Sequence, residues 1–465
     1  MVSFFIYDMI FLVLFSLFVV VFLYKRRKNL KREGILFLYR TKIGLKVIDY
    51  VGGKYKRTLK FLQYPIIILS YVLMILMTWM LINVLKLYMF SPQITEFFKA
   101  PPLLPLVPYI TSTFDLNSFL PPLYFTYWII SILVIAIVHE FAHGIYAKYY
   151  GVKIKSTGFG FLGPLLAAFV EPDEKALMKK SNKQQLSVLG AGVFANVITA
   201  IIFFFLIWGF FSIGFVESGA MFSSYSYNII HKSNLTNING VDVTIDSAEG
   251  LIDSIDDESF VEVNYDYVLK KEDLVRQIES DSEYMQVFHD LPAVRNDLKG
   301  VIVEVDGVEI KNQEDLTVYM KERKVGEEII LRTIFDDEEI EYKIELGKDP
   351  NNEERAVLGI TSTKNVKRIL ESFAFFKNPG TYYESRVDGI TIFIYYLLWW
   401  IFLINVAVAL FNALPIGIVD GGRIFYITML SLTKSKKFAE KSYKIVTWFF
   451  ILLFFAMMWL WVRAL

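Results

Sequence analysis

Residues 128–143 read WIISILVIAIVHEFAH, an apolar run that ends in two histidines and a glutamate. No charged residue lies between Asp115 and Glu140, so the run has the composition of a membrane-spanning helix. On a helix, residues four apart share a face, so His139 and His143 can bind one metal ion while Glu140 points to a neighbouring water. Groups that ionise inside a bilayer are costly and normally mark function. This favours a metal site over a histidine pair that merely reaches the membrane interface.

The composition indicates a membrane protein. Of the 465 residues, 54% are hydrophobic and 41 are phenylalanine, which is too apolar for a soluble domain of this size. The formal net charge is zero, so we expect no nucleic-acid partner. The chain contains no cysteine, which leaves histidine and carboxylate side chains as ligands for a metal such as zinc. Residues 1–24 lack a basic start and a cleavage site, which predicts a retained anchor rather than a removed signal peptide.

Six segments are apolar and long enough to span a bilayer core, which needs roughly 20 helical residues. They cover residues 4–24, 62–85, 121–146, 185–212, 390–412 and 445–462. The segment between the first two is strongly basic, so the positive-inside rule places it in the cytosol. Alternation then places the histidine pair near the cytosolic leaflet of the cell membrane. The same alternation places the polar segment 213–388 on the extracytoplasmic side.

The polar segment is predicted to fold as an α+β domain. Residues 300–310 alternate in hydrophobicity around an Asp306-Gly307 turn, which predicts two paired strands. A helix is expected from Glu314, followed by a second hairpin near Asp336. This order of strand, turn, strand, helix, strand, strand resembles a PDZ domain, and residues 281–362 are its clearest unit.

Two further features extend this resemblance. Residues 291–293 (Leu-Pro-Ala) and 298–300 (Leu-Lys-Gly) occupy the place where PDZ domains of membrane and periplasmic proteases carry their ligand-groove segment. Residues 238–251 repeat the pattern weakly, either as a second, degenerate PDZ unit or as an elaboration of the first. PDZ domains bind peptides by adding a strand to a sheet edge, so the expected ligand is a polypeptide segment.

A second candidate site lies at the end of the fifth apolar segment, where residues 412–421 read NALPIGIVDG. Pro415 and Gly417 should end the helix there. No charged residue lies between Asp388 and Asp420, so the Asp420 carboxylate closes a membrane segment at the depth of the histidine pair. Taken alone, Asp420 is also a good cap for the helix that follows it.

The two motifs together, HExxH in one apolar segment and NxxPxxxxDG in a later one, resemble those of the site-2 protease family of intramembrane zinc metalloproteases. The resemblance implies a Zn²⁺ ion held by His139, His143 and Asp420. It makes Glu140 the general base that activates zinc-bound water. It also gives Asn412, in the second motif, a role in supporting the substrate or the oxyanion.

Two other elements are similar to parts of this family. Gly192 and Asn196 resemble the family's GxxxN element, where Asn196 would support substrate or oxyanion. The alternative is a small residue for helix packing and an amide that bonds between helices. Residues 158–164, rich in glycine, resemble the family's membrane-associated β-hairpin, which presents an edge to an extended substrate. A plain interfacial loop is the other interpretation.

The sequence therefore predicts a polytopic α-helical membrane protein with about six transmembrane helices and an extramembrane PDZ-like domain or tandem. Its expected activity is regulated intramembrane proteolysis: hydrolysis of peptide bonds within or next to transmembrane segments of substrate proteins. The predicted regions are 1–115 (anchor helices and basic loop), 116–212 (protease core), 213–388 (PDZ-like region) and 389–465 (C-terminal helices). The expected partners are transmembrane protein substrates, peptide segments at the PDZ-like domain, and the lipid bilayer.

Two other functions remain open. One is a membrane zinc peptidase that acts on interfacial or soluble segments, as CAAX-processing enzymes do, although these generally take a downstream glutamate as third ligand. The other is an inactive PDZ-bearing membrane scaffold, against which the intact Glu140 argues.

Overall fold

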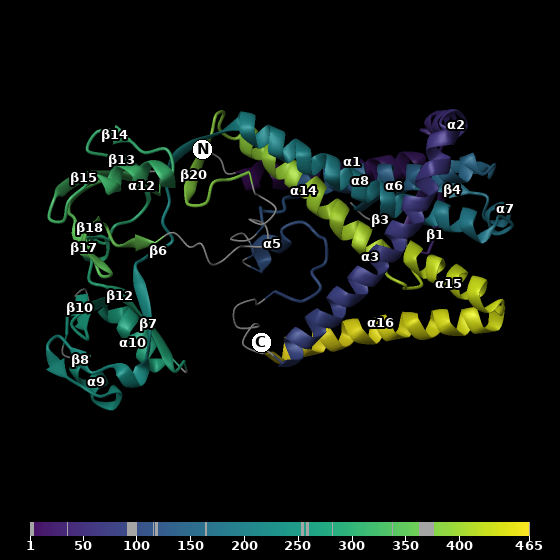
Figure 1. Cartoon of the computed structure of the whole chain (residues 1–465). Helices are drawn as coiled ribbons and strands as arrows, with labels where there is room; N and C mark the ends of the chain where they lie inside the picture. The colour runs from purple at the N-terminus through teal and green to yellow at the C-terminus, as the bar shows by residue number, and fades with distance from the viewer. Residues whose placement is uncertain are drawn as a thin grey trace. The chain divides into compact units, whose positions relative to one another are not determined.

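The computed structural model of the chain describes residues 4–34, 36–90, 100–114, 116, 120–162, 165–252, 255–256, 260–280, 282–336, 338–361 and 376–464. The chain divides into two compact units (Figure 1). We call Met1–Phe211 with Gly389–Leu465 the membrane unit, and Ser212–Asp388 the inserted unit.

The membrane unit is built on long apolar helices. In the described part of the chain, six are long and apolar enough to cross a membrane, as the sequence predicts. They are α1 (Phe4–Arg26), α3 (Lys56–Phe90), α6 (Phe125–Tyr149), α8 (Asn182–Gly214), α14 (Ile390–Asn412) and α16 (Lys436–Ala464). Shorter helices join them: η1 (Arg27–Asn29), α2 (Leu45–Lys54), α5 (Ile110–Thr113), α7 (Glu174–Met178) and α15 (Asp420–Thr433).

A four-stranded antiparallel sheet belongs to the same unit. Its strands follow the order β1 (Leu30–Glu33), β2 (Leu36–Thr41), β3 (Ile154–Leu162) and β4 (Leu165–Pro172). The glycine-rich segment is therefore a hairpin of two strands, although Gly163 and Pro164 lie outside the described residues. The basic segment, predicted only as a loop, supplies β1 and β2. An ion pair from Arg40 of β2 to Glu171 of β4, at 3.0 Å, crosses the intervening strand.

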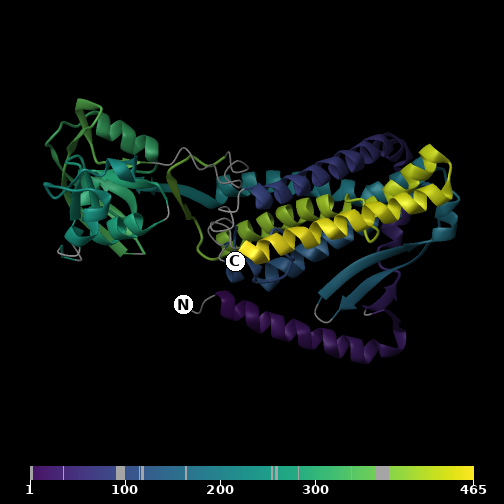
Figure 2. The ribbon, with the colours of Figure 1, turned by 90° about the horizontal axis from the view of Figure 1, so that it is seen from below.

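Helix α6 lies at the centre of this unit and packs against α14, α2 and β4. Its N-terminal half forms an aromatic core in which Phe125 and Trp128 meet Trp400 of α14. Figure 2 shows α1, in purple, along one side of the membrane unit beside the sheet. Phe22 of α1 contacts Phe161 of β3 at a ring-centroid distance of 5.6 Å.

The inserted unit has two lobes, each with a six-stranded sheet. The first lobe contains β7 (Tyr227–His231), η3 (Lys232–Asn234), β8 (Asn237–Ile238), β9 (Val241–Asp242), α9 (Ile245–Ile252), β10 (Phe260–Val263), β11 (Tyr267–Lys270), α10 (Lys271–Glu279) and β12 (Tyr284–His289). The second contains β5 (Phe215–Ala220), α11 (Pro292–Arg295), β13 (Val301–Val305), β14 (Val308–Glu309), α12 (Gln313–Lys321), β15 (Glu328–Phe335), β16 (Glu338–Glu345) and β20 (Thr381–Ser385). Two small ladders accompany it, β17 (Gly347–Asp349) with β18 (Asn352–Val357), and β19 (Ile360–Thr361) with β6 (Ser224–Tyr225).

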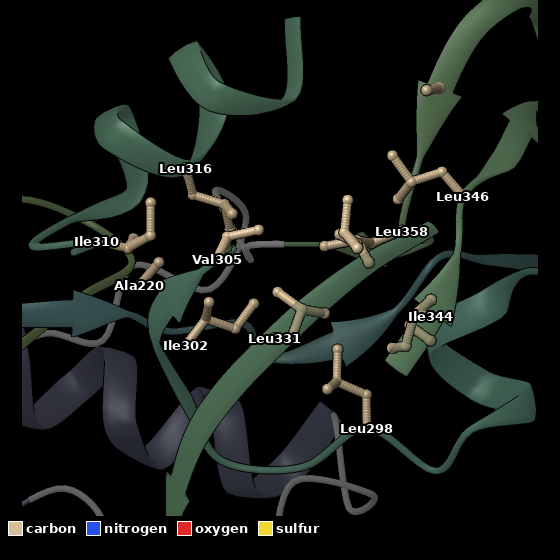
Figure 3. Packing of buried hydrophobic residues seen from close by; sticks show 13 residues of the cluster. Ala220, Leu298, Ile302, Val305, Ile310, Leu316, Leu331, Ile344, Leu346 and Leu358 are labelled. Atoms are coloured by element: carbon tan, nitrogen blue, oxygen red, sulfur yellow. The ribbon is translucent and has the colours of Figure 1, made fainter. Parts of the chain in front are cut away.

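The second lobe has the order of elements that the sequence predicts for a PDZ-like domain. Strands β13 and β14 pair around the Asp306-Gly307 turn, and β15 pairs with both β13 and β16. Helix α12 begins after Asn312, whose side chain accepts hydrogen bonds from the first free N–H groups of the helix. The helix packs Leu316 into a core with Val305 and Leu331 (Figure 3).

The first lobe repeats this topology. Strands β8 and β9 pair around a turn, α9 follows, and β10 pairs antiparallel with both β8 and β11. The lobe has its own core, which includes Ile238, Val261 and Leu274. A separate core and the matching pairing of these four strands favour a second unit of this topology over an elaboration of the first.

Candidate metal centre and active site

Two elements bring the candidate ligands together. His139 and His143 lie on the C-terminal half of α6, one helical turn apart. Asp420 is the first residue of α15, but Val419 is the N-cap residue and no side chain caps this helix. Gly421 and Gly422 follow, and a Cβ on either would collide with backbone carbonyls of residues 413–416. The loop after α14 therefore folds closely over the start of α15, which directs the Asp420 carboxylate towards α6.

The three ligand atoms form a compact triangle. The two Nε2 atoms of His139 and His143 are 3.0 Å apart. The Asp420 Oδ2 atom lies 3.2 Å from His139 Nε2 and 3.3 Å from His143 Nε2. Within the described residues, this is the one cluster of three or more side chains with metal-ligating atoms close enough to share an ion.

The triangle has the dimensions of one face of a zinc tetrahedron. With metal–ligand bonds of about 2.0–2.1 Å, tetrahedral ligand atoms lie about 3.3–3.4 Å apart. The donor set of two imidazoles and one carboxylate leaves the fourth position open, which is typical of catalytic rather than structural zinc. The residues present therefore suit a catalytic zinc ion.

Hydrogen bonds behind the imidazoles orient them for this role. His143 Nδ1 lies 2.7 Å from the carbonyl oxygen of Val188, so Nδ1 donates and Nε2 presents its lone pair to the metal position. The Asn196 amide lies beside His139 Nδ1, with its Nδ2 at 3.2 Å, while its Oδ1 has no hydrogen-bond partner among the described residues. Metal binding through Nε2 leaves Nδ1 of His139 protonated. A half-turn of the Asn196 amide makes Oδ1 the acceptor of this proton, which gives the imidazole N–H and the amide oxygen a hydrogen-bond partner.

Gly192 lies directly against the two imidazoles. A Cβ at this position would be 2.5 Å from His143 Nε2 and 2.7 Å from His139 Nε2. Only glycine therefore leaves the ligand atoms in place. In this chain Gly192 leaves room for the two histidines and Asn196 contacts one of them, while support of substrate or oxyanion by Asn196 stays a prediction.

Glu140 points to the neighbouring sheet. Its Oε2 accepts a hydrogen bond from the backbone N–H of Val170 in β4, at 2.9 Å. The candidate general base is therefore adjacent to both the ligand triangle and the edge strand. His139 is only 9% exposed, so little solvent screens electrostatic interactions at its side chain.

Sequence reasoning identifies the side chains of this site but not its backbone partners. Asn412 is the last residue of α14, eight positions before Asp420, and its predicted support of substrate or oxyanion stays a prediction. The carbonyl of Val188 and the N–H of Val170 were not predicted. Backbone groups of apolar residues carry no sequence signal, and only the packing of α8 and β4 on α6 brings them to the site.

Comparison with known proteins agrees with this geometry. The model of peptidase family M50 matches residues 127–457, which include both motifs and the inserted unit. The chain belongs to peptidase family M50. This is the site-2 protease family, whose members are zinc metalloproteases.

Similarities to individual proteins and to solved structures are weaker. An uncharacterized protein of Methanocaldococcus jannaschii is 26% identical over 403 residues, which cover 85% of this chain and 79% of that protein. The PDZ domain of an SdrC-like protein from Listeria monocytogenes is 25% identical over 17% of this chain and 81% of that domain, with a TM-score of 0.15. Such a low TM-score does not establish a shared fold, so the PDZ-like description depends on the strand order of the inserted unit.

Proposed function

We propose that this M50 protein is an intramembrane zinc endopeptidase that cleaves membrane proteins within or next to their transmembrane segments. The observation that carries this proposal is the ligand triangle of His139, His143 and Asp420, formed by elements of the membrane unit with Glu140 beside it. A bilayer contains little water for hydrolysis, so a buried and oriented site for water and peptide is what the reaction requires.

Each side chain has a distinct task in the proposed reaction. When bound, zinc supplies Lewis-acid chemistry, polarising the substrate carbonyl and acidifying water. Glu140 removes a proton from the attacking water and afterwards delivers it to the leaving amine. His139 and His143 stay neutral and oriented through the Asn196 amide and the Val188 carbonyl. Their fixed geometry means that no rearrangement of ligands is needed during the reaction.

The edge of β4 is suited to presenting the substrate. A helical substrate hides its carbonyls in internal hydrogen bonds, so it must be extended before cleavage. Opposite residues of antiparallel strands alternate between hydrogen-bonded and non-hydrogen-bonded pairs. Because the Val170 N–H donates to the Glu140 side chain of α6, the N–H groups of Val170 and, by alternation, Ala168 point away from β3 and towards the free edge of β4. A substrate strand added at this edge would pass directly beside the general base.

The predicted topology completes the proposal. The positive-inside rule places the basic segment with β1 and β2 in the cytosol, which puts the ligand triangle near the cytosolic leaflet and the inserted unit on the extracytoplasmic side. Labelling of single engineered cysteines in intact cells tests this, because the chain contains no other thiol. Labelling of Lys321→Cys, in the inserted unit, by an impermeant maleimide is expected. Labelling of Lys42→Cys under the same conditions would contradict the topology.

We further propose that the second lobe of the inserted unit binds polypeptide segments. A cavity of about 320 Å³ lies between α12 and residues 358–360, and Met320 and Leu291 contribute to its wall. Lys299 and Gly300 instead line a different cavity of about 810 Å³. The predicted ligand-groove segment is thus divided between two cavities, and the α12 cavity has the helix-and-strand walls that suit an added peptide strand.

Substitutions on one helix test this second role. Met320→Glu should weaken binding of an extended apolar peptide, because it places a carboxylate in the cavity. Val318→Glu is the matched control, since Val318 lies on the same helix, is 54% exposed and does not line the cavity. Equal peptide affinity of the two variants, measured by fluorescence anisotropy, would remove the α12 cavity from the proposal.

The decisive experiment is cleavage of a single-span substrate in liposomes. Glu140→Gln should abolish cleavage yet retain zinc, because it keeps the ligands and removes only the base. Glu174→Gln, an exposed glutamate on α7, serves as control and should cleave normally. Cleavage by Glu140→Gln at the wild-type rate would refute the mechanism. Cleavage of soluble peptides but not of the single-span substrate would favour the interfacial peptidase, and zinc-loaded wild type without any cleavage would favour the scaffold.

A further inference from the structure

A buried carboxylate on the first helix is not used by the proposed reaction. Asp8 of α1 is 1% exposed, although it lies within a candidate membrane span. Ionisable groups within such spans are rare and are retained for a purpose. Asp8 lies before residue 127, where the match to the M50 family model begins, so family membership gives it no role.

The Asp8 carboxylate accepts four hydrogen bonds, two on each oxygen. Oδ1 accepts from the Thr126 N–H at 2.8 Å and from the Thr126 hydroxyl at 2.5 Å. Oδ2 accepts from the Phe125 N–H at 2.8 Å and from the Tyr109 hydroxyl at 2.6 Å. A carboxylate has about four acceptor positions, so these donors fill it and leave no room for a bound cation.

Two of the donors are the first N–H groups of α6, the helix that carries the HExxH motif. The N-cap residue of α6, Tyr124, provides no side-chain cap. Helix-terminal N–H groups need a partner, and the need is greatest at membrane depth, where no water replaces it. Asp8 therefore caps α6 from a neighbouring helix.

The cap at the N-terminal end of α6 affects the position of the metal ligands, which lie in the C-terminal half of the same helix. Phe125 and His139 are 14 residues apart, which is about 21 Å along a helix, and no glycine or proline interrupts the interval. Such a helix transmits an axial shift or rotation from one end to the other. The third ligand, Asp420, belongs to a different helix, α15, so the shape of the ligand triangle depends on where α6 is held.

We propose that Asp8 is a positioning residue of the proteolytic site: by capping α6 from α1, it fixes where His139 and His143 sit relative to Asp420. This inference rests on the proposed proteolytic function. It makes α1 part of the catalytic machinery, although no residue of that helix belongs to the predicted site.

The test uses the isosteric variant Asp8→Asn in the full-length, metal-loaded protein. Asparagine has one oxygen for four donors, and its amide hydrogens would face one of the two N–H groups of α6 that Asp8 caps. A displacement of about 1 Å at the ligands lowers kcat by about 10- to 100-fold. We expect KM to be nearly unchanged, because substrate binding is not the interaction removed. The visible absorption spectrum of the cobalt-substituted protein should also change, since it reports ligand geometry without any need for activity.

A milder pair of variants covers the case in which Asp8→Asn does not fold. Thr126→Val removes one donor to Asp8 and should lower kcat by several-fold with an altered cobalt spectrum. Thr78→Val is its matched control, because the Thr78 hydroxyl donates to a carbonyl of its own helix, α3. Folded Asp8→Asn or Thr126→Val protein with wild-type kcat and cobalt spectrum overturns the inference. If wild type binds cobalt but cleaves nothing, the proposed function fails, and the spectra still decide whether Asp8 positions the ligands.

Discussion

Gly192→Ala should disable the metal centre through one added methyl group. The new carbon would lie 2.5–2.7 Å from ring atoms of His139 and His143. Ordinary contacts between non-bonded atoms are about 3.5 Å, so each imidazole must move by about 0.8–1.0 Å. Zinc sites tolerate deviations of only about 0.2 Å in ligand distances. We therefore expect zinc affinity to fall by about 100-fold, the upper end of what loss of a supporting partner typically costs.

Zinc affinity is best measured by competition with a chelator, with bound metal quantified by mass spectrometry. Gly209→Ala is the matched control, because Gly209 lies on the same helix, α8, and an added Cβ there meets nothing within 4 Å. Both substitutions favour the helix by about 1 kcal/mol. A loss confined to Gly192→Ala must therefore come from the clash with the imidazoles.

The opposite result would be informative about the site. If Gly192→Ala binds zinc and cleaves substrate as well as Gly209→Ala, the histidines do not hold the metal in the observed arrangement. The assignment of His139 and His143 as ligands would then have to be withdrawn.

Three further predictions concern other parts of the chain. Asn196→Leu, similar in volume, should lower zinc affinity by about 10- to 100-fold, and unchanged chelator competition would argue against the hydrogen bond to His139. Burial alone would raise the pKa of Asp297, but hydrogen bonds from Lys299 and Lys270 outweigh it and hold that pKa below its ordinary value. The ionised Asp297 side chain therefore stabilises the folded state fully above about pH 4, which is the pKa of an aspartate in the unfolded chain. This stabilisation is lost as pH falls through the lower pKa of Asp297 in the folded state. Asp297→Asn should accordingly be less stable than wild type at neutral pH, with a difference in urea midpoint that shrinks on acidification; a constant difference would contradict this. Leu331→Ala should destabilise the inserted unit by about 2–5 kcal/mol, and an unchanged unfolding midpoint would show that its core does not limit stability.

Much of the architecture follows from patterns that are local in the sequence. Long apolar runs predict the membrane helices, because a helix satisfies all its backbone hydrogen bonds internally and few other structures can do so inside a bilayer. The Asp306-Gly307 turn between alternating strands predicts the second lobe, since turn chemistry and strand periodicity agree there. The start of α16 at Lys436 was missed because its first turns are too polar to resemble a membrane span. Strands β1 and β2 were missed because their basic residues indicate a cytosolic loop, whereas pairing with β3 decides their conformation.

The chemistry of the site can be inferred from the amino-acid sequence. Two histidines and two carboxylates are the side chains that a catalytic metal needs, and they lie in apolar segments where ionisable groups are too costly to persist without a function. How these side chains are held depends on the packing of the folded chain. The space at Gly192 and the cap that Asp8 provides for α6 join residues far apart in the chain. Such contacts leave no periodic or local signal, since they depend on how whole helices pack and not on the residues beside them in the sequence.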